Sequence, residues 1–476
     1  MNKYDRQIRL WSSQGQLALK SAHVLVLGVS VSTTEMVKCL ALAGVAHISL
    51  AGTQVVTPEI LASSFFVPYD SLGMPLVDAC IPYLQQLNPD ILIDKATSFA
   101  ADQYSVICVT NGTTEKLQSL YDPTPIVELS SYGFYARVRA FYPQYSSYQT
   151  HPSSLVDLRF ATDVWPELQE YIDSIDIDSS DSMYRENVPY IVILAKLAER
   201  DGIPQTAAAK IAFKRAILEQ AGTNDDNWRE AASASYQLWA QAVPPSVLQL
   251  FPQIDKNLKA RPNEFWVLMA ALRAFYCKNN TFPVSGVLPD MKTDTVSYTA
   301  LQTIYRAKAQ RDAEELRQYA LELGHPYNIN ANEDSIKVFC KNCRHIIVLD
   351  GQSPAANLDL ITAVEGHDKQ VDGDSRLATY RDIFFAIEAA CHKLARDGVW
   401  SPTRQEADRF HQEYPLVRQA AVVNEIVRSG GMELNAISSM AGGMAAQEVT
   451  KLILNQYTPI QHTLVYDGTT SSAHTF

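Results

Sequence analysis

Residues 23–52, HVLVLGVSVSTTEMVKCLALAGVAHISLAG, decide the fold of this chain. An apolar run rich in β-branched residues ends at Gly28, residues 33–43 carry apolar side chains at helical spacing, and a second apolar run follows at 46–52. A strand, a turn, a helix and a second strand in this order are typical of a βαβ unit that contributes to a parallel sheet.

The turn between the first strand and the helix is where dinucleotide-binding folds carry G-x-G-x-x-G, because their backbone N–H groups must approach phosphates. Here the window reads Gly28-Val29-Ser30-Val31-Ser32-Thr33, so only the first glycine is present. Ser30 and Thr33 place Cβ atoms where a close approach needs none. The second strand ends at Ala51-Gly52, without the acidic residue that would hold a ribose. This degenerate loop predicts a turn that binds no nucleotide.

The rest of the chain divides into a sheet-rich block, a helical block and a short return to the sheet. A helix pattern at 75–87 and strand patterns at 105–113, 125–129 and 134–142 complete the first block. Helix patterns then dominate as far as residue 413, before a helix at 435–456 and a strand at 462–468. Because a lone terminal strand needs a sheet to join, the sequence predicts an α/β, Rossmann-like domain formed by residues 1–150 and 421–476. A large, mainly helical insertion at 151–420 interrupts it.

Composition narrows the class of partner. The net charge of −12 argues against a nucleic-acid or anionic membrane surface, because both need clustered Lys and Arg. The N-terminus lacks an apolar signal segment, and no apolar run reaches the roughly 18–20 residues that cross a bilayer. Seven scattered cysteines suit a reducing compartment. We therefore expect a cytoplasmic or nuclear protein with no nucleic-acid or membrane partner.

Two stretches could suggest a metal ion, and neither has the ligand set for one. Cys340 and Cys343 form a CxxC pair near His345, but a structural zinc site needs four ligands and there is no second pair. The acidic run that begins at Asp173 lacks the glycine and the final glutamate of a calcium loop. The sequence predicts no metal site in this chain.

Three motifs in order resemble the ubiquitin-like activating enzymes, whose adenylation domain is of the ThiF/MoeB type. They are YDRQIRLW at 4–11, the βαβ unit, and GGMAAQEVTK at 442–451. In this family two adenylation halves pair, and one half is a degenerate copy. This chain is similar to the degenerate half, and most similar to the regulatory subunits that serve a Nedd/Rub-type modifier.

The resemblance implies a non-catalytic subunit, a pseudoenzyme without independent activity. Its catalytic partner in the heterodimer would hold ATP and Mg²⁺, adenylate the C-terminal glycine of the ubiquitin-like modifier and form a cysteine thioester. The modifier, and transiently a conjugating enzyme, would be further partners. This chain would bind no cofactor itself, and its insertion resembles the family's catalytic-cysteine domain without the cysteine in its Cys-Thr context.

Position by position, the family's nucleotide contacts are missing together. An active half would carry an aspartate at the second strand end, an Asn-Arg pair, a lysine and a later aspartate, and this chain has instead Gly52, Ser63-Ser64, Met74 and Asn111. Losses at the phosphate, ribose and magnesium contacts at once indicate a pseudo-active site, since metal-bound triphosphate needs oxygen ligands.

The resemblance also implies positive roles. Arg6 would reach the partner's ATP in trans, with Arg9 as the alternative, because a guanidinium offers forked donors and a permanent charge to a triphosphate. Contacts to the catalytic subunit are expected on one helical segment, at Tyr305, Arg306, Lys308, Arg311 and Asp312. Gly442 and Gly443 would either pack within the chain or contact the partner's matching helix.

Three alternatives stay open at this point. The equivalent subunit for the SUMO modifier has a much shorter insertion and is the weaker match. An NAD(P)-dependent oxidoreductase predicts an intact glycine loop and an acidic strand end, which are both missing. An interaction scaffold that contributes no arginine to catalysis differs from the favoured function only in the role of Arg6.

Overall fold

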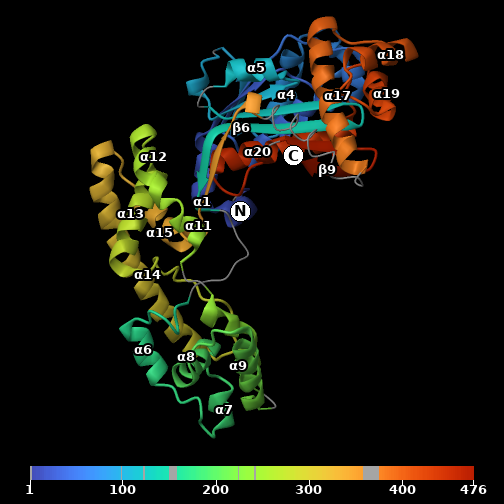
Figure 1. The fold of residues 1–476 in the computed structure, drawn as a ribbon. Helices are drawn as coiled ribbons and strands as arrows, with labels where there is room; N and C mark the ends of the chain where they lie inside the picture. The colour runs from blue at the N-terminus through green and yellow to red at the C-terminus, as the bar shows by residue number, and fades with distance from the viewer. Residues whose placement is uncertain are drawn as a thin grey trace. The chain divides into compact units, whose positions relative to one another are not determined.

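The structure is a computed structural model that describes residues 3–97, 99–121, 124–149, 158–222, 225–240, 243–356, 375–461 and 463–476. The chain forms two compact units, Met1–Tyr145 with Val348–Phe476, and Ser146–Ile347 (Figure 1). The predicted α/β fold with a helical insertion is confirmed. The expected insertion ended near residue 420, whereas the second unit ends at Ile347 and the following helices belong to the first.

The first unit is built on one mixed sheet, which has nine strands within the described residues. The strands run in the order β3-β2-β1-β4-β5-β6-β8-β9, and β7 pairs with β6. The pairs β3/β2, β2/β1, β1/β4 and β4/β5 are parallel, and β5/β6, β6/β8 and β8/β9 are antiparallel. The strands span β1 His23–Leu27, β2 His47–Ala51, β3 Leu92–Lys95, β4 Val106–Thr110, β5 Ile126–Tyr132, β6 Tyr135–Ser147, β7 Ile347–Gln352, β8 Thr463–Asp467 and β9 Ser472–Thr475.

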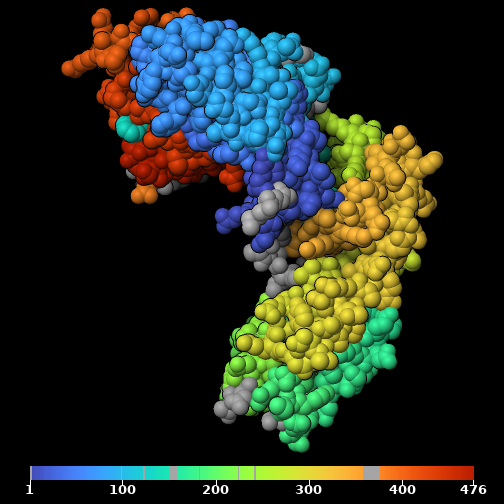
Figure 2. Space-filling view, turned by 180° about the vertical axis from the view of Figure 1, so that it is seen from behind, coloured from blue at the N-terminus to red at the C-terminus, as the bar shows by residue number. Residues whose placement is uncertain are grey.

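The helices of the first unit come from both ends of the chain, and Figure 2 shows the N-terminal residues (blue) against the C-terminal residues (red) in this unit. They are α1 Asp5–Ser21, α2 Val31–Ala43, α3 Pro58–Ser63, α4 Leu76–Gln86, α5 Thr114–Leu120, α17 Ser375–Asp397, α18 Arg404–Glu413, α19 Ala420–Ser429 and α20 Asn435–Leu454. Short 3₁₀ turns lie at η1 Tyr69–Ser71 and η2 Ala101–Gln103.

Two apolar layers hold this unit together. Buried side chains of α17 and α19, among them Ile383 and Ile426, pack with Tyr132 of β5 and Val465 of β8. Leu117 of α5 packs with Leu25 and Ile107 on the sheet. The terminal strand β8 therefore joins the sheet begun by the N-terminal residues, as the sequence predicted.

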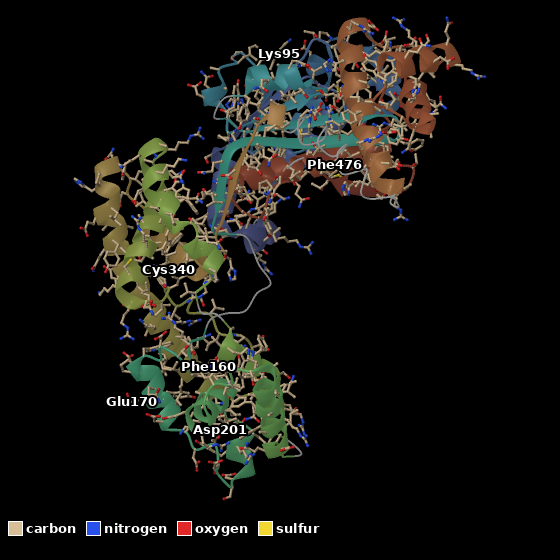
Figure 3. All side chains as sticks on the ribbon, viewed as in Figure 1. Lys95, Phe160, Glu170, Asp201, Cys340 and Phe476 are labelled. Carbon is tan, nitrogen blue, oxygen red and sulfur yellow. The ribbon has the colours of Figure 1, made fainter. Side chains whose placement is uncertain are left out.

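The second unit is mainly helical. Its elements are α6 Pro166–Asp173, α7 Ser182–Arg185, α8 Tyr190–Asp201, α9 Ala207–Gln220, α10 Asp226–Ala234, η3 Ser235–Trp239, α11 Pro245–Leu248, η4 Phe251–Gln253, α12 Ile254–Ala260, α13 Glu264–Asn279, α14 Thr295–Gly324, η5 His325–Tyr327 and α15 Glu333–Asn342. One core gathers Trp165, Trp228 and Tyr305 with the buried face of α8. Phe160, labelled in Figure 3, belongs to the same core. Among the described residues, no helix has both the length and the apolar character needed to cross a membrane.

Candidate functional site

The degenerate loop keeps the geometry of a strand-to-helix turn. Gly28 has φ +87°, a conformation that favours glycine, and its N–H donates to the carbonyl of Ala51 at 2.7 Å. The Thr110 hydroxyl donates to the Gly28 carbonyl at 2.5 Å. The remaining glycine is therefore required by the backbone of the turn, whether or not a ligand is present.

Helix α2 begins with a capping box that uses the two residues replacing the lost glycines. The Ser30 hydroxyl accepts the Thr33 N–H at 3.4 Å, and the Thr33 hydroxyl accepts the Ser30 N–H at 2.6 Å. Such reciprocal bonds satisfy donors that a helix leaves free at its start. The substitutions that break the nucleotide motif thus stabilise the helix.

A carboxylate from the far end of the chain takes further donors of this helix start. Glu433 Oε2 accepts the Ser32 N–H at 2.8 Å, and its Oε1 accepts the hydroxyls of Ser30 at 3.0 Å and Ser32 at 2.8 Å. Burial raises the pKa of Glu433, and the hydrogen bonds from Ser32 and Ser30 oppose that rise. The start of α2 is therefore occupied by an acidic side chain of the same chain.

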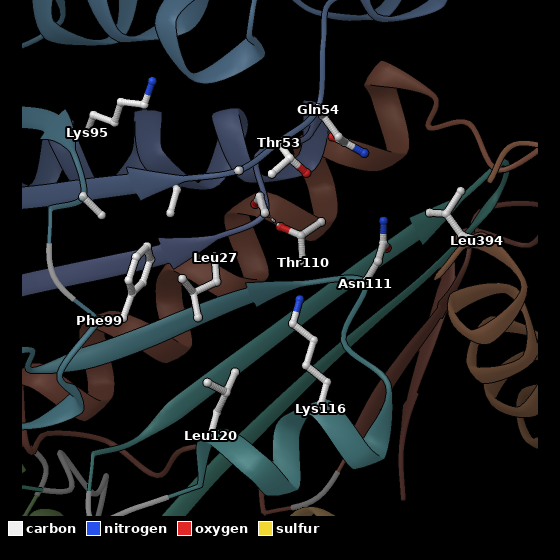
Figure 4. Close-up of a pocket in the computed structure, with 14 residues that line it drawn as sticks. Leu27, Thr53, Gln54, Lys95, Phe99, Thr110, Asn111, Lys116, Leu120 and Leu394 are labelled. Atoms are coloured by element: carbon white, nitrogen blue, oxygen red, sulfur yellow. Dashed lines mark hydrogen bonds between the residues drawn. The ribbon is translucent and has the colours of Figure 1, made fainter. Parts of the chain in front are cut away.

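A cleft of about 520 Å³ lies at the carboxyl ends of β1, β2 and β4, the edge where ligands bind in open α/β sheets. Its lining is Leu27, Gly28, Ala51, Gly52, Thr53, Gln54, Lys95, Ala96, Phe99, Thr110, Asn111, Lys116, Leu120 and Leu394 (Figure 4). This lining contains no carboxylate that could hold a magnesium ion. The residues present do not fit a magnesium-bound nucleotide.

Two lysines of the cleft have different surroundings. The Lys95 amino group pairs with Asp78 at 3.1 Å. The Lys116 amino group points between Leu27 and Asn111 in Figure 4 and has no ion-pair partner within the described residues. The Asn111 side-chain oxygen is buried without a hydrogen-bond partner there, in a residue with φ +50°. The sequence analysis did not identify either lysine.

A buried ionic network supports the loop that follows β4. Arg137 donates to Glu128 at 3.1 Å and to Glu388 at 2.6 Å, and Arg139 donates to Glu128 at 2.8 Å. Arg139 also donates to the Gly112 carbonyl at 2.8 Å, and Glu388 accepts the Thr114 N–H at 3.0 Å. All four charged side chains are at most 11% exposed. Helix α17 is thereby joined to the cleft wall that carries Asn111 and Lys116.

The N-terminal segment is anchored on the end of α2. Tyr4 is buried against Gly44, and its hydroxyl accepts the Asn88 side-chain amide at 2.9 Å. The Gln16 amide donates to the Ala43 carbonyl at 3.1 Å. Helix α1 is kinked at Trp11 and Ser12, and the Trp11 carbonyl accepts Gln456 of the C-terminal region at 3.0 Å. Both ends of the kink are thus fixed to the domain.

The two candidate arginines lie on this anchored segment, and they differ in their ion-pair partners. Arg9 is exposed and forms an ion pair with Asp5 at 2.9 Å. Arg6 is exposed, and the described part of the chain provides no hydrogen-bond or ion-pair partner for it. The first unit therefore holds Arg6 on a fixed helical turn with its guanidinium unused.

Two of the expected contact residues on α14 are buried within their own unit. Tyr305 is fully buried and donates its hydroxyl to the Leu158 carbonyl at 2.6 Å, so it belongs to the core of the second unit. Asp312 is 2% exposed and accepts the Val284 N–H at 2.9 Å and Lys308 at 2.6 Å. Neither side chain is available to a partner, because both lie on the face of α14 turned to its own unit.

The other expected residues of α14 lie at the surface. Arg306 and Arg311 are exposed, and Lys308 is partly buried. Arg311 pairs with Glu167 at 2.6 Å, an ion pair accessible to solvent on both sides. The surface candidates are thus Arg306, Lys308 and Arg311.

The two glycines of α20 differ as well. A Cβ at Gly442 would lie 2.7 Å from the Ser32 carbonyl and 2.8 Å from the Met36 nitrogen, so this glycine permits close packing of α20 on α2. A Cβ at Gly443 would meet no atom within 4 Å. Gly442 has the intrachain role, and Gly443 faces open space.

Within the described residues, no group of three or more His, Cys, Asp or Glu side chains is placed so that it could hold a metal ion. Cys340 and Cys343 are buried in the second unit, where the Cys343 thiol donates to the Cys340 carbonyl at 3.3 Å. Glu433 is the residue that the sequence analysis missed most clearly. No motif marks it, because its partners precede it by some four hundred positions.

Comparison with known proteins gives a family and full-length relatives. The model of the ThiF family matches residues 4–476. The NEDD8-activating enzyme E1 regulatory subunit of Drosophila melanogaster is 29% identical, over 99% of this chain and 96% of that protein. The protein of the same name from Xenopus laevis is 28% identical, over 100% and 98%. The NEDD8-activating enzyme E1 regulatory subunit AXL of Arabidopsis thaliana is 27% identical, over 98% and 97%.

Proposed function

Because this chain belongs to the ThiF family, we propose that it is the regulatory subunit of a heterodimeric enzyme that activates a NEDD8-type ubiquitin-like modifier. The relatives that carry this name match it from end to end, with the helical insertion included. In this proposal the catalytic subunit holds ATP and Mg²⁺, adenylates the modifier's C-terminal glycine and forms the thioester.

The observation that carries the proposal is the contrast between a filled nucleotide loop and an unused arginine. The start of α2 holds Glu433, and the cleft beside it has no carboxylate for magnesium. Arg6 is exposed on a helix that Tyr4 and Gln16 fix to the domain. A chain that cannot bind the nucleotide but presents a positioned guanidinium is suited to completing a partner's site.

Arg6 is proposed to reach the partner's ATP, and Arg9 is the weaker candidate because Asp5 already neutralises it. Because the helix that carries Arg6 is anchored, only its side chain has to be ordered when it meets a charged transition state. The exposed arginines of α14, Arg306 and Arg311, are proposed to contact the catalytic subunit from the second unit.

The oxidoreductase alternative has no support in the site. Strand β2 ends at Ala51, and Gly52 stands at the position after it, where a Cβ would make a tight contact of 3.1 Å with the Val29 nitrogen. The acidic residue that would hold a ribose is therefore missing from this position.

Co-purification tests the pairing. The full chain and a catalytic adenylation subunit should form a 1:1 complex that adenylates the modifier, whereas this chain alone should neither bind ATP nor form a thioester. Arg306→Glu should weaken the complex, while Arg215→Glu, on the exposed face of α9, serves as a matched charge reversal that should not. Micromolar ATP affinity of the isolated chain would overturn the pseudoenzyme assignment.

A further inference from the structure

Loss of the loop glycines does not by itself remove the groups that bind phosphate. Helix α2 still begins at Val31, and the N–H groups of its first turn have no partners within the helix. Such donors, with the positive end of the helix dipole, form a ready anion site. An additional feature must explain why this site would stay closed to a nucleotide.

The partners of those donors provide that feature. The Thr33 N–H is taken by the Ser30 hydroxyl, and the Ser32 N–H by the Glu433 carboxylate. The hydroxyls of Ser30 and Ser32, residues that are 7% and 0% exposed, also donate to Glu433. Two buried hydroxyls and a helical N–H therefore converge on one internal anion.

We propose that Glu433 occupies the place of a phosphate group at the start of α2 and is the residue that excludes nucleotides and other polyphosphates from this chain. A carboxylate and a phosphate oxygen accept the same kinds of donors, and both gain from the positive end of a helix. The exclusion is therefore direct competition for donors, in addition to the loss of close approach at Ser30 and Thr33.

The surrounding contacts hold Glu433 in this position from both sides. Glu433 forms a β-bridge with Gly133 at the β5–β6 turn. Two residues later, Asn435 donates to the Ser63 carbonyl at 2.8 Å as α20 begins. Further along α20, Gly442 packs against Ser32 and Met36 of the same helix α2. The carboxylate is thus part of the contact between α2 and α20.

Competition favours an internal anion fixed in this way. A group held by the fold acts at an effective concentration on the order of millimolar or above, without the entropy cost of binding a free ligand. The lining of the neighbouring cleft agrees, since it includes Gly28 but none of residues 30–33 among the described residues. A free polyphosphate in the cleft would have no access to the α2 donors while Glu433 remains.

The test compares three forms of the full chain, purified without a partner: wild type, Glu433→Ala and Glu433→Gln. Inorganic pyrophosphate is the probe, its affinity is measured by calorimetry, and thermal unfolding is followed with and without it. Glu433→Ala frees the donors and should bind pyrophosphate at least about tenfold more tightly than wild type, with a matching rise in Tm. Glu433→Gln keeps the side-chain volume but loses the negative charge and one acceptor oxygen, so its affinity should lie between those of wild type and Glu433→Ala.

Glu425→Ala controls for the loss of a nearby carboxylate, because Glu425 accepts the Phe134 N–H at 2.9 Å and, among the described residues, has no hydrogen bond or ion pair with α2. A folded Glu433→Ala that binds no pyrophosphate would overturn the proposal, as would wild type binding equally well. If Glu433→Ala does not fold, Glu433→Gln takes its place, and pyrophosphate binding no tighter than in wild type would then overturn the proposal. These measurements use this chain alone, so their outcome is independent of the proposed heterodimer.

Discussion

The ring of Tyr4 packs directly on Gly44, so that a Cβ at Gly44 would lie 2.8 Å from the phenol Cζ and hydroxyl. Gly44 has φ +87° and ends α2 in the left-handed conformation. The same helix therefore holds Glu433 at its start and the N-terminal segment with Arg6 at its end.

This contact predicts the effect of Gly44→Ala. The left-handed backbone costs about 1 kcal/mol for alanine, and the collision with Tyr4 adds about 1–2 kcal/mol. Urea unfolding should show the sum of these two losses in the free energy of unfolding. Gly73→Ala is the matched control, because Gly73 has φ +79° but no atom within 4 Å of a Cβ, and it should lose only the backbone component. Equal losses in both variants would contradict the proposed packing of Tyr4.

The adjacent glycines of α20 predict opposite results. Gly442→Ala should lower the free energy of unfolding by about 1–3 kcal/mol, because its Cβ would collide with Ser32 and Met36 of α2. Gly443→Ala should be neutral or stabilise by up to about 1 kcal/mol, because alanine is the better helix former and the space is open. Denaturant unfolding of both variants measures this. A destabilised Gly443→Ala would place that residue against another element.

The buried ionic network predicts sensitivity to acid. Burial acts to raise the pKa of Glu388, but Arg137 and Arg139 outweigh it and lower that pKa to about 2. A carboxyl whose pKa is depressed in the folded state contributes stability above its unfolded value near 4.5, and loses it as the pH falls towards 2. Glu388→Gln should cost about 3 kcal/mol at neutral pH, since it leaves two buried arginines with one carboxylate. Between about pH 4.5 and pH 2, the free energy of unfolding should change less with pH for this variant than for wild type.

Glu115→Gln is the control for that experiment. Glu115 lies 3.7 Å from His392 next to the network, but its side chain is 74% exposed. The substitution should leave both the neutral stability and the acid dependence within about 0.5 kcal/mol of wild type. A comparable loss in Glu115→Gln would mean that the buried pairs are not the source of the effect.

A second pH effect is predicted at the amino ends of β1 and β2. The rings of His23 and His47 stack at 3.7 Å, with Tyr104, Ser49 and Asp94 around them. Burial, and then the neighbouring His47, lower the pKa of His23, which Asp94 partly opposes. Below pH 6.5, the pKa of an unperturbed histidine, the unfolded chain binds a proton that folded His23 resists. The free energy of unfolding therefore decreases as the pH decreases through this range. His23→Phe keeps the stacked ring, and its Tm should depend less on pH between about 7 and 5.5. An unchanged dependence would exclude His23 as its source.

The sequence predicted where helices form more accurately than it predicted which of the two units each helix packs in. The helix predicted at 33–43 is α2, because its spacing and its end at Gly44 are local signals. The helix patterns that continue to residue 413 include α17, whose apolar face packs on β5 and β8 of the first unit. A helical pattern predicts that one face is buried but not which element covers it, so the sequence alone assigns this helix to an insertion that reaches residue 420.

In the candidate site, too, the sequence does not reveal which residues pack against each other across the fold. Tyr305 and Asp312 lie within a charged helical segment, and only the packing of α14 against its own unit shows that they are buried. Glu433 could not be predicted, because its role depends on a contact with residues 30 and 32 across the fold. The loss of the glycine motif, by contrast, was visible in the sequence, since it depends on consecutive residues.

ATP–pyrophosphate exchange by the reconstituted heterodimer with Arg6→Ala measures the proposed contribution of Arg6 to the partner's site. The exchange rate should fall by about tenfold or more while the 1:1 complex stays intact, because the partner's triphosphate loses a guanidinium. Arg9→Ala, whose side chain is already paired with Asp5, should stay within about twofold of wild type. Exchange at the wild-type rate in an intact Arg6→Ala complex would contradict the account and leave this chain as a scaffold.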